Sequence, residues 1–180
     1  MKLKTLGLIG LLPLSVAAHA ADVATPVAPA AAPATAPAPQ PPARGPALAL
    51  AVEAAQKALE TCKALDQKIS VSVLDSGSVL KVLLASDGAA PRGVQSSTNK
   101  AITALAFNAA SSKVGELAKT DPVIAEKLAA NPNFNSRAGA VLIKVGNEVI
   151  GAIGVGGAKG SEKDEACAIA GLEKIQNKLS

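Results

Sequence analysis

The stretch GAIGVGGAKGSEKDEACA, residues 151–168, has the residue types of a phosphate-binding loop: an apolar strand, a glycine-rich turn and a helix start. Its spacing does not fit that chemistry. A Walker loop needs G-x-x-x-x-G-K-[ST], and a dinucleotide fingerprint needs glycine where Lys159 stands. Glu162, Asp164 and Glu165 also crowd the helix start, where their negative charge would repel an anion.

Other polar residues of this region allow two interpretations. Ser161 can cap the last helix, with Asp164 three residues later completing a capping box. Asp164 and Glu165 then complement the helix dipole, or as adjacent carboxylates they form an incomplete cation site, for example for iron. Arg92 and Arg137 lie in predicted loops and are candidate contacts for an anion.

The two cysteines, Cys62 and Cys167, lie on the first and last predicted helices. A disulfide between them would close a loop of about 100 residues, which stabilises by roughly 4 to 5 kcal/mol in the chain-entropy model. Two separate buried thiols are the alternative, because Cys167 lies at the edge of its apolar stripe.

Missing residue types exclude several functions. His19 is the only histidine and Met1 the only methionine, and the chain has no tyrosine or tryptophan. After residue 20 there is therefore no imidazole for a Ser-His-Asp triad or a histidine zinc site. A bound haem would have no histidine, methionine or tyrosine axial ligand from this chain. The net charge of +4 comes from mixed charges without interleaved aromatics, which argues against nucleic-acid binding.

The first 45 residues are predicted not to belong to the folded domain. Lys2 and Lys4, the apolar run LGLIGLLPLSV and the small residues AHA are typical of a secretory signal peptide over residues 1–20. Its apolar run is too short for a transmembrane helix, so no stable membrane insertion is expected after cleavage. Residues 21–45 are almost all alanine and proline, which predicts a disordered linker. Residues 46–180 then form one domain of a periplasmic or secreted protein.

Apolar periodicity predicts the elements that position these residues. The first helix is marked by apolar residues three and four positions apart, namely Leu48, Val52, Ala55, Leu59 and Cys62. Alternation over residues 68–85 predicts a hairpin around the turn DSGS, and residues 141–156 predict another around Gly146-Asn147. A helix is expected over residues 92–113. Short helices and loops should follow, with breaks at Asp121-Pro122 and Asn131-Pro132, and the last helix should begin at Ser161. The last helix is expected to bury Ala168, Leu172, Ile175 and Leu179. The order predicts an antiparallel, layered α+β domain.

Three segments together resemble the GlcG/HbpS-like haem-degrading domain family over residues 48–179. They are the hairpin SVSVLDSGSVLKVLLASDGA, the helix NKAITALAFN and the C-terminal run NEVIGAIGVGGAKGSEKDEACAIAGLEKI. The resemblance implies a profilin-like, three-layer α/β/α fold around a five-stranded antiparallel sheet, of which the pattern shows four strands. It also implies a homo-oligomer. Secreted relatives bind haem, some with roles in iron handling or redox sensing, whereas others are linked to glycolate metabolism or to PduO-type adenosyltransferases.

The resemblance also implies site residues. Thr103 matches the threonine implicated in haem contact in secreted relatives, and its alternative role is a hydrogen bond back to its own helical turn. Lys100, one turn earlier, can pair with a haem propionate or serve as an exposed, solubilising lysine. The family's Asp-x-Gly-Gly turn reads DSGS here, and its aromatic in the Lys-Ala-x-Thr helix is Ile102. These departures remove groups that could contact a porphyrin.

The predicted function is binding of haem or a related tetrapyrrole by a secreted protein, in haem or iron handling or redox sensing. Haem is not required for the fold, and a binding protein is favoured over an enzyme because no acid or base is apparent. One alternative is an enzyme or accessory protein that acts on a small organic acid. The other is a purely structural oligomer.

Overall fold

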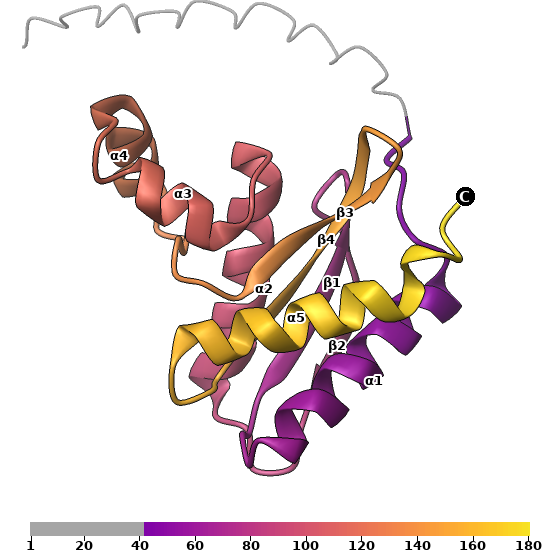
Figure 1. Ribbon diagram of the computed structural model, residues 1–180. Helices are drawn as coiled ribbons and strands as arrows, with labels where there is room; N and C mark the ends of the chain where they lie inside the picture. The colour runs from indigo at the N-terminus through magenta and orange to yellow at the C-terminus, as the bar shows by residue number, and fades with distance from the viewer. Residues whose placement is uncertain (1–41) are drawn as a thin grey trace, which may run out of the picture. The chain divides into compact units, whose positions relative to one another are not determined.

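The computed structural model describes residues 42–180. The predicted signal peptide and residues 21–41 of the predicted linker lie outside the described residues. The described part contains five helices and four strands (Figure 1): α1 Leu48–Ala64, β1 Ser70–Asp75, β2 Leu80–Ala85, α2 Pro91–Phe107, α3 Ser111–Leu117, α4 Pro122–Ala129, β3 Ala140–Val145, β4 Glu148–Gly156 and α5 Ser161–Gln176. Among these residues, no helix has the length and apolar character needed to cross a membrane.

The four strands form one antiparallel sheet in the order β2-β1-β4-β3. Both predicted hairpins are present, and β1 pairs with β4 from Ser70 opposite Gly156 to Asp75 opposite Gly151. The fifth strand that the family resemblance implied is absent from the described residues. Residues 86–139, between the two hairpins, form helices and loops instead, and prolines begin two of those helices.

Helices cover both faces of the sheet (Figure 1). The helices α1 and α5 pack on the face that carries Val71, Val73 and Ile153, whereas α2 packs on the face that carries Ser72 and Leu74. Because both faces are covered, β4 is buried at every residue from 150 to 156. The predicted mixed α+β class with an antiparallel sheet is confirmed, and the finer profilin-like classification stays a prediction.

The contact between α1 and α5 is built from small residues. The buried residues of α1 are Ala51, Ala54, Ala55, Ala58 and Cys62. This buried stripe differs from the predicted one, because Leu48 is 59% exposed. The physical reason is that alanine lets the two helices approach more closely than leucine would. Gly171 of α5 lies against the Ala54 carbonyl, which a side chain at that position would meet at 2.6 Å.

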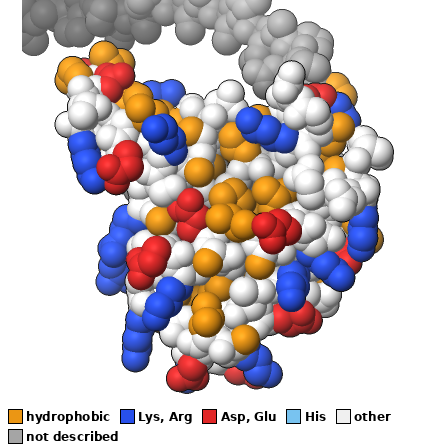
Figure 2. Space-filling view, in the orientation of Figure 1, with side chains coloured by type: hydrophobic (Ala, Val, Ile, Leu, Met, Phe, Trp, Pro, Cys, Tyr) orange, Lys and Arg blue, Asp and Glu red, His pale blue; other side chains and the backbone are white. Residues whose placement is uncertain are grey.

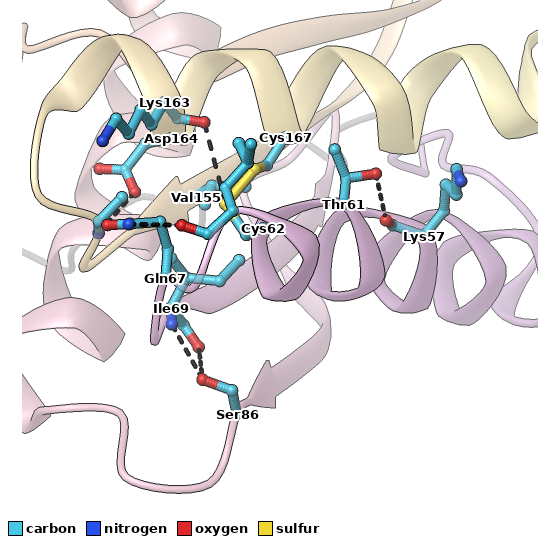
Figure 3. The surroundings of a disulfide bond; sticks show 12 residues. Lys57, Thr61, Cys62, Gln67, Ile69, Ser86, Val155, Lys163, Asp164 and Cys167 are labelled. Carbon is cyan, nitrogen blue, oxygen red and sulfur yellow. Dashed lines mark hydrogen bonds between the residues drawn. A yellow bond between two sulfur atoms is a disulfide. The ribbon is translucent and has the colours of Figure 1, made fainter.

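A disulfide joins Cys62 of α1 to Cys167 of α5, with the two Cα atoms 5.7 Å apart (Figure 3). Of the two predicted alternatives, the bridge is therefore the one present, and the described residues hold no free cysteine. Cys167 lies on the α1-facing side of α5 because the small residues around it let the two helices meet there. The bridge links residues 105 positions apart.

The first described residues are held by the turns of both hairpins. The Arg44 N–H donates to Ser76 Oγ at 2.9 Å, and the Ser76 N–H donates to the Arg44 carbonyl at 2.8 Å. The Arg44 guanidinium also pairs with Glu148. Residues 42–45, assigned above to the linker, therefore contact the domain. Arg44 thus has partners in both turns, and the predicted domain boundary at residue 46 stays a prediction.

Charges of both signs are interspersed over the face of the molecule shown in Figure 2, and hydrophobic side chains gather near its middle. No large field of one sign is visible on this face. That distribution agrees with the mixed charge pattern of the sequence.

Candidate functional site

A hollow of about 530 Å³ opens beside α2 and the start of α5. Three segments line it: the first turns of α2, the loop of residues 132–137, and residues 157–164. Most of its wall is polar, with the side chains of Arg92, Gln95, Ser96, Asn99, Lys100, Asn135, Arg137, Ser161 and Asp164. Concave sites with convergent polar groups are the usual place for a ligand, so this hollow is the candidate site.

The sequence of α2 explains why one of its faces lines the hollow. Pro91 begins the helix at a position where proline costs no hydrogen bond. From there, Ser96, Asn99 and Lys100 fall three and four residues apart, on one face. Glycines bring the helix close to β4, and a side chain at Gly156 would lie 2.7 Å from the Ser97 nitrogen. The close packing fixes the polar face of α2 beside the end of β4.

Lys100 and Asp164 form a buried ion pair in the wall of this hollow. Lys100 Nζ donates to Asp164 Oδ2 at 2.7 Å and to the Val155 carbonyl at 3.1 Å, and the two side chains are 2% and 3% exposed. Burial lowers the pKa of Lys100 and raises the pKa of Asp164, while their mutual attraction opposes both shifts. The prediction of an exposed Lys100 is wrong, because its partners lie 55 and 64 residues away in the sequence.

The glycine-rich loop before α5 binds the carboxylate of its own helix. The Ala158 N–H donates to Asp164 Oδ1 at 2.9 Å. Asp164 thus accepts a backbone N–H of this loop, as a phosphate does in glycine-rich phosphate-binding loops. The predicted capping box is wrong as a result: Gly160 is the N-cap residue without a side-chain cap, and Ser161 Oγ accepts a hydrogen bond from Arg137 Nε at 3.2 Å.

Thr103 anchors the loop that forms another wall of the hollow. Its hydroxyl donates to the Asn99 carbonyl at 2.8 Å, which is the bond within the helix considered above. The same oxygen accepts the Asn135 N–H at 2.7 Å. Asn135 Nδ2 in turn donates to Ser96 Oγ at 3.1 Å. Thr103 is fully buried, so it holds the loop that carries Arg137 and does not itself face the hollow.

Glu165 also has a structural role. Its carboxylate accepts hydrogen bonds from Ser112 Oγ at 2.8 Å and from the Gly139 N–H at 3.2 Å. It therefore holds different partners from Asp164 and does not share a site with it. Within residues 42–180, no group of three or more histidine, cysteine or acidic side chains is arranged to hold a metal ion.

Arg92 lies in the first turn of α2 and not in a loop as predicted, whereas Arg137 lies in a loop, and the structure places both at the hollow. Both are exposed, and neither has a carboxylate within ion-pair distance among the described residues. Because Lys100 and Asp164 neutralise each other, the two arginines give the hollow an excess of positive charge. The site can therefore bind an anion, and guanidinium groups are well suited to carboxylates.

Phe134, which pattern reasoning overlooked, is the aromatic residue of the wall. It is half-buried and packs edge-to-face on Phe107, with ring centroids 5.4 Å apart. These are the two phenylalanines of the chain. Their rarity could have drawn attention to this loop, as could the Asn131-Pro132 break that sets its start.

Fold and site together define an α+β domain with a cationic hollow at one end of an antiparallel sheet. The chain belongs to the HbpS-like family: the family model described as "Haem degrading protein HbpS-like" matches residues 47–173. No curated protein matched the sequence.

Solved structures agree with this assignment. A double mutant of HbpS from Streptomyces reticuli is 32% identical over 81% of this chain and 97% of its own, with a TM-score of 0.66. Klebsiella pneumoniae ORFY, a DUF336 protein, is 20% identical over 81% of this chain and 100% of its own, with a TM-score of 0.70. PduOC, solved in complex with haem, is 18% identical over 73% and 95%, with a TM-score of 0.66. The last two similarities show the fold alone.

Proposed function

We propose that this protein binds haem or a related tetrapyrrole at the hollow, with Arg92 and Arg137 holding the two propionates. The observation that carries the proposal is this pair of exposed arginines without acidic partners among the described residues, beside the half-buried ring of Phe134. Membership of the HbpS-like family and the fold shared with a haem-bound PduOC domain support the ligand class.

The residues fit the organic part of haem better than its iron. The arginines suit the carboxylates, and Phe134 can contact the ring face. The described residues contain no histidine, methionine or tyrosine, and both cysteines are in the disulfide. A strong protein ligand for iron is therefore missing from this part of the chain. Bound haem would bring redox chemistry at its iron, whereas the protein's own residues would hold and orient the ring.

A titration with and without iron tests this proposal. Haemin and metal-free protoporphyrin IX should both give a saturable shift of the Soret band, with similar affinity, because carboxylates and ring carry the binding. The dimethyl ester of the porphyrin should bind about tenfold or more weakly, the factor expected for a lost charge-assisted hydrogen bond. Binding of haemin without binding of the free porphyrin would place the site elsewhere, at an iron ligand.

Variants locate the site. Arg92→Gln and Arg137→Gln should each weaken binding, and Lys113→Gln, which removes an exposed cation from α3 outside the hollow, should not. Equal effects of all three would indicate nonspecific attraction by positive charge. No saturable shift with any porphyrin would refute the proposal.

We further propose that the protein acts in the periplasm or after secretion, in haem or iron handling or redox sensing. The signal-peptide pattern of residues 1–20 and the Cys62–Cys167 disulfide support this location, because disulfides persist in oxidising compartments. Fractionation of producing cells tests it: protein retained in the cytoplasm with an intact N-terminus would contradict it. The homo-oligomer that the resemblance implies stays a prediction, which light scattering can check.

A small organic acid is the second candidate ligand. The polar wall of the hollow favours it, since Ser96, Asn99 and Asn135 offer hydrogen bonds that a porphyrin ring cannot use. Calorimetric titration with small carboxylates distinguishes the two: heat with a small acid, and no Soret shift with any porphyrin, would favour the second candidate.

A further inference from the structure

Lys100 is the one buried amine of the candidate site, and the proposed tetrapyrrole binding makes no use of it. A buried ion pair is weak evidence for stability, because apolar residues of similar volume often stabilise a protein as well or better. The pair lies in the wall of the hollow, away from the apolar core between the sheet and α1 and α5. In the wall of the hollow, the pair is placed where it could take part in chemistry on a bound ligand.

A neutral amine at Lys100 can keep the hydrogen bonds that the ion pair makes. An ammonium group has three N–H donors, whereas a neutral amine has two and a lone pair. Among the described residues, Nζ has two acceptors: Asp164 Oδ2 at 2.7 Å and the Val155 carbonyl at 3.1 Å. The ammonium of the ion pair has a third N–H, and the loss of that proton leaves both hydrogen bonds in place and frees a lone pair.

The surroundings make the neutral amine of Lys100 easier to reach than that of an exposed lysine. Burial lowers the pKa of Lys100, and the nearby charge of Arg137 lowers it further. Asp164 and Glu165 are the acids whose charges oppose this effect. A desolvated lysine beside another cation is the arrangement that makes amines nucleophilic in enzymes that form Schiff bases.

We propose that Lys100 captures the carbonyl group of a small 2-oxo acid as an imine, while Arg92 and Arg137 hold the acid's carboxylate. The Nζ lone pair attacks the carbonyl carbon, so that a C–N bond forms and the C=O π bond breaks. The former carbonyl oxygen leaves as water with both amine protons. Asp164, at 2.7 Å, is placed to take a proton from nitrogen and return it to oxygen. No oxidant or further reactant is needed.

The polar wall fits this class of compound. A 2-oxo acid needs one cationic contact for its carboxylate and a nearby amine for its carbonyl, and the hollow has both. Its volume of about 530 Å³ is ample for such a ligand. The inference shares the two arginines with the proposed function but does not depend on haem binding.

Reductive trapping on the unaltered protein tests the inference. Pyruvate or 2-oxoglutarate is added with sodium cyanoborohydride, which reduces an imine to a stable secondary amine, and proteolytic fragments are then analysed by mass spectrometry. Lys100 should carry the modification before the exposed Lys159 and Lys68, although it is the more buried residue. Acetone, which has the carbonyl but no carboxylate, should modify Lys100 about tenfold less.

Two variants sharpen the result. Arg137→Gln should reduce modification of Lys100 by the acids much more than by acetone, because only the acids have a carboxylate for Arg137 to hold. Lys100→Arg keeps the positive charge and cannot form an imine, so in a folded variant the preferential modification should disappear. An unmodified Lys100, or one modified no faster than exposed lysines, overturns the inference. Because the mapping uses the unaltered chain, either result stands whether or not the porphyrin titration succeeds.

Discussion

The two faces of the sheet differ in what they bury. Between the sheet and the helices α1 and α5 lies an apolar core of alanine, valine and isoleucine, joined by the disulfide. Between the sheet and α2 lies a smaller apolar cluster around Leu74 and Ala101, and this face also buries polar groups. Ser72 Oγ is 2.8 Å from both Ser97 Oγ and Thr98 Oγ1, and Lys100 of α2 forms the buried ion pair. Alternate residues of the same strands supply both faces. One face of the sheet thus carries the main apolar core, whereas the other combines a smaller core with the polar groups next to the hollow.

Removal of the disulfide should give the largest effect. Replacing Cys62 and Cys167 by alanine should lower the free energy of unfolding by about 4 to 5 kcal/mol, because the bridge closes a loop of more than a hundred residues. Urea unfolding followed by circular dichroism measures this change. Porphyrin affinity of the folded variant should stay near that of the parent protein. A large loss of affinity would show that the two faces are not independent.

The buried ion pair is the corresponding test on the other face. Lys100→Met leaves Asp164 buried without its cation, and should cost about 3 to 5 kcal/mol. Adding Asp164→Asn removes the unpaired charge and keeps an acceptor for the Ala158 N–H, so the double variant should recover much of that loss. A double-mutant cycle from chemical denaturation measures the coupling. Additive effects would mean that the pair contributes little.

Thr103 links the polar face to the loop that carries Arg137. Thr103→Val should cost about 1 to 3 kcal/mol, because the partly buried Asn135 N–H loses its acceptor. The variant should also bind porphyrin more weakly, since Arg137 is less well positioned, whereas Thr103→Ser keeps the hydroxyl and should restore both properties. Denaturation and Soret titration of the two variants provide the measurements. Weaker binding by the serine variant as well would point to direct contact with the ligand.

The smallest effect is expected at the outer edge of the apolar face. The hydrogen bond from Lys178, followed by the charges of Lys178 and Lys174, holds the pKa of Glu53 below its ordinary value of 4.5. A lowered carboxyl pKa stabilises the fold above its ordinary value, and that stabilisation is lost as pH falls through the lowered value. Glu53→Gln should therefore leave acid stability unchanged and slightly reduce Tm at neutral pH, as calorimetry at both pH values would show. A larger change at acid pH would contradict this assignment.

The strands could be predicted from the sequence because each face of a hairpin imposes a period of two. The buried stripe of α1 could not be predicted in the same way. Alanine and leucine are both apolar, and the close approach of α5 decides which of them are covered. The burial of Lys100 could not be predicted, because its partner Asp164 lies 64 residues away in the sequence. The arginines were recognised one by one, whereas their meeting at one hollow depends on the fold.

The position of residues 42–46 decides how the domain can be joined to a fusion partner or to a surface. They join the domain at the hairpin turns, and the nine-residue strand β4 runs from there to the hollow, a distance of about 26 Å. The C-terminus lies at that same end, where Lys178 meets Glu53 near the start of α1 (Figure 1). A fusion partner or a sensor surface coupled directly at residue 42 or at the C-terminus would thus leave the hollow facing solution. The domain is suited to oriented immobilisation without any redesign of the site.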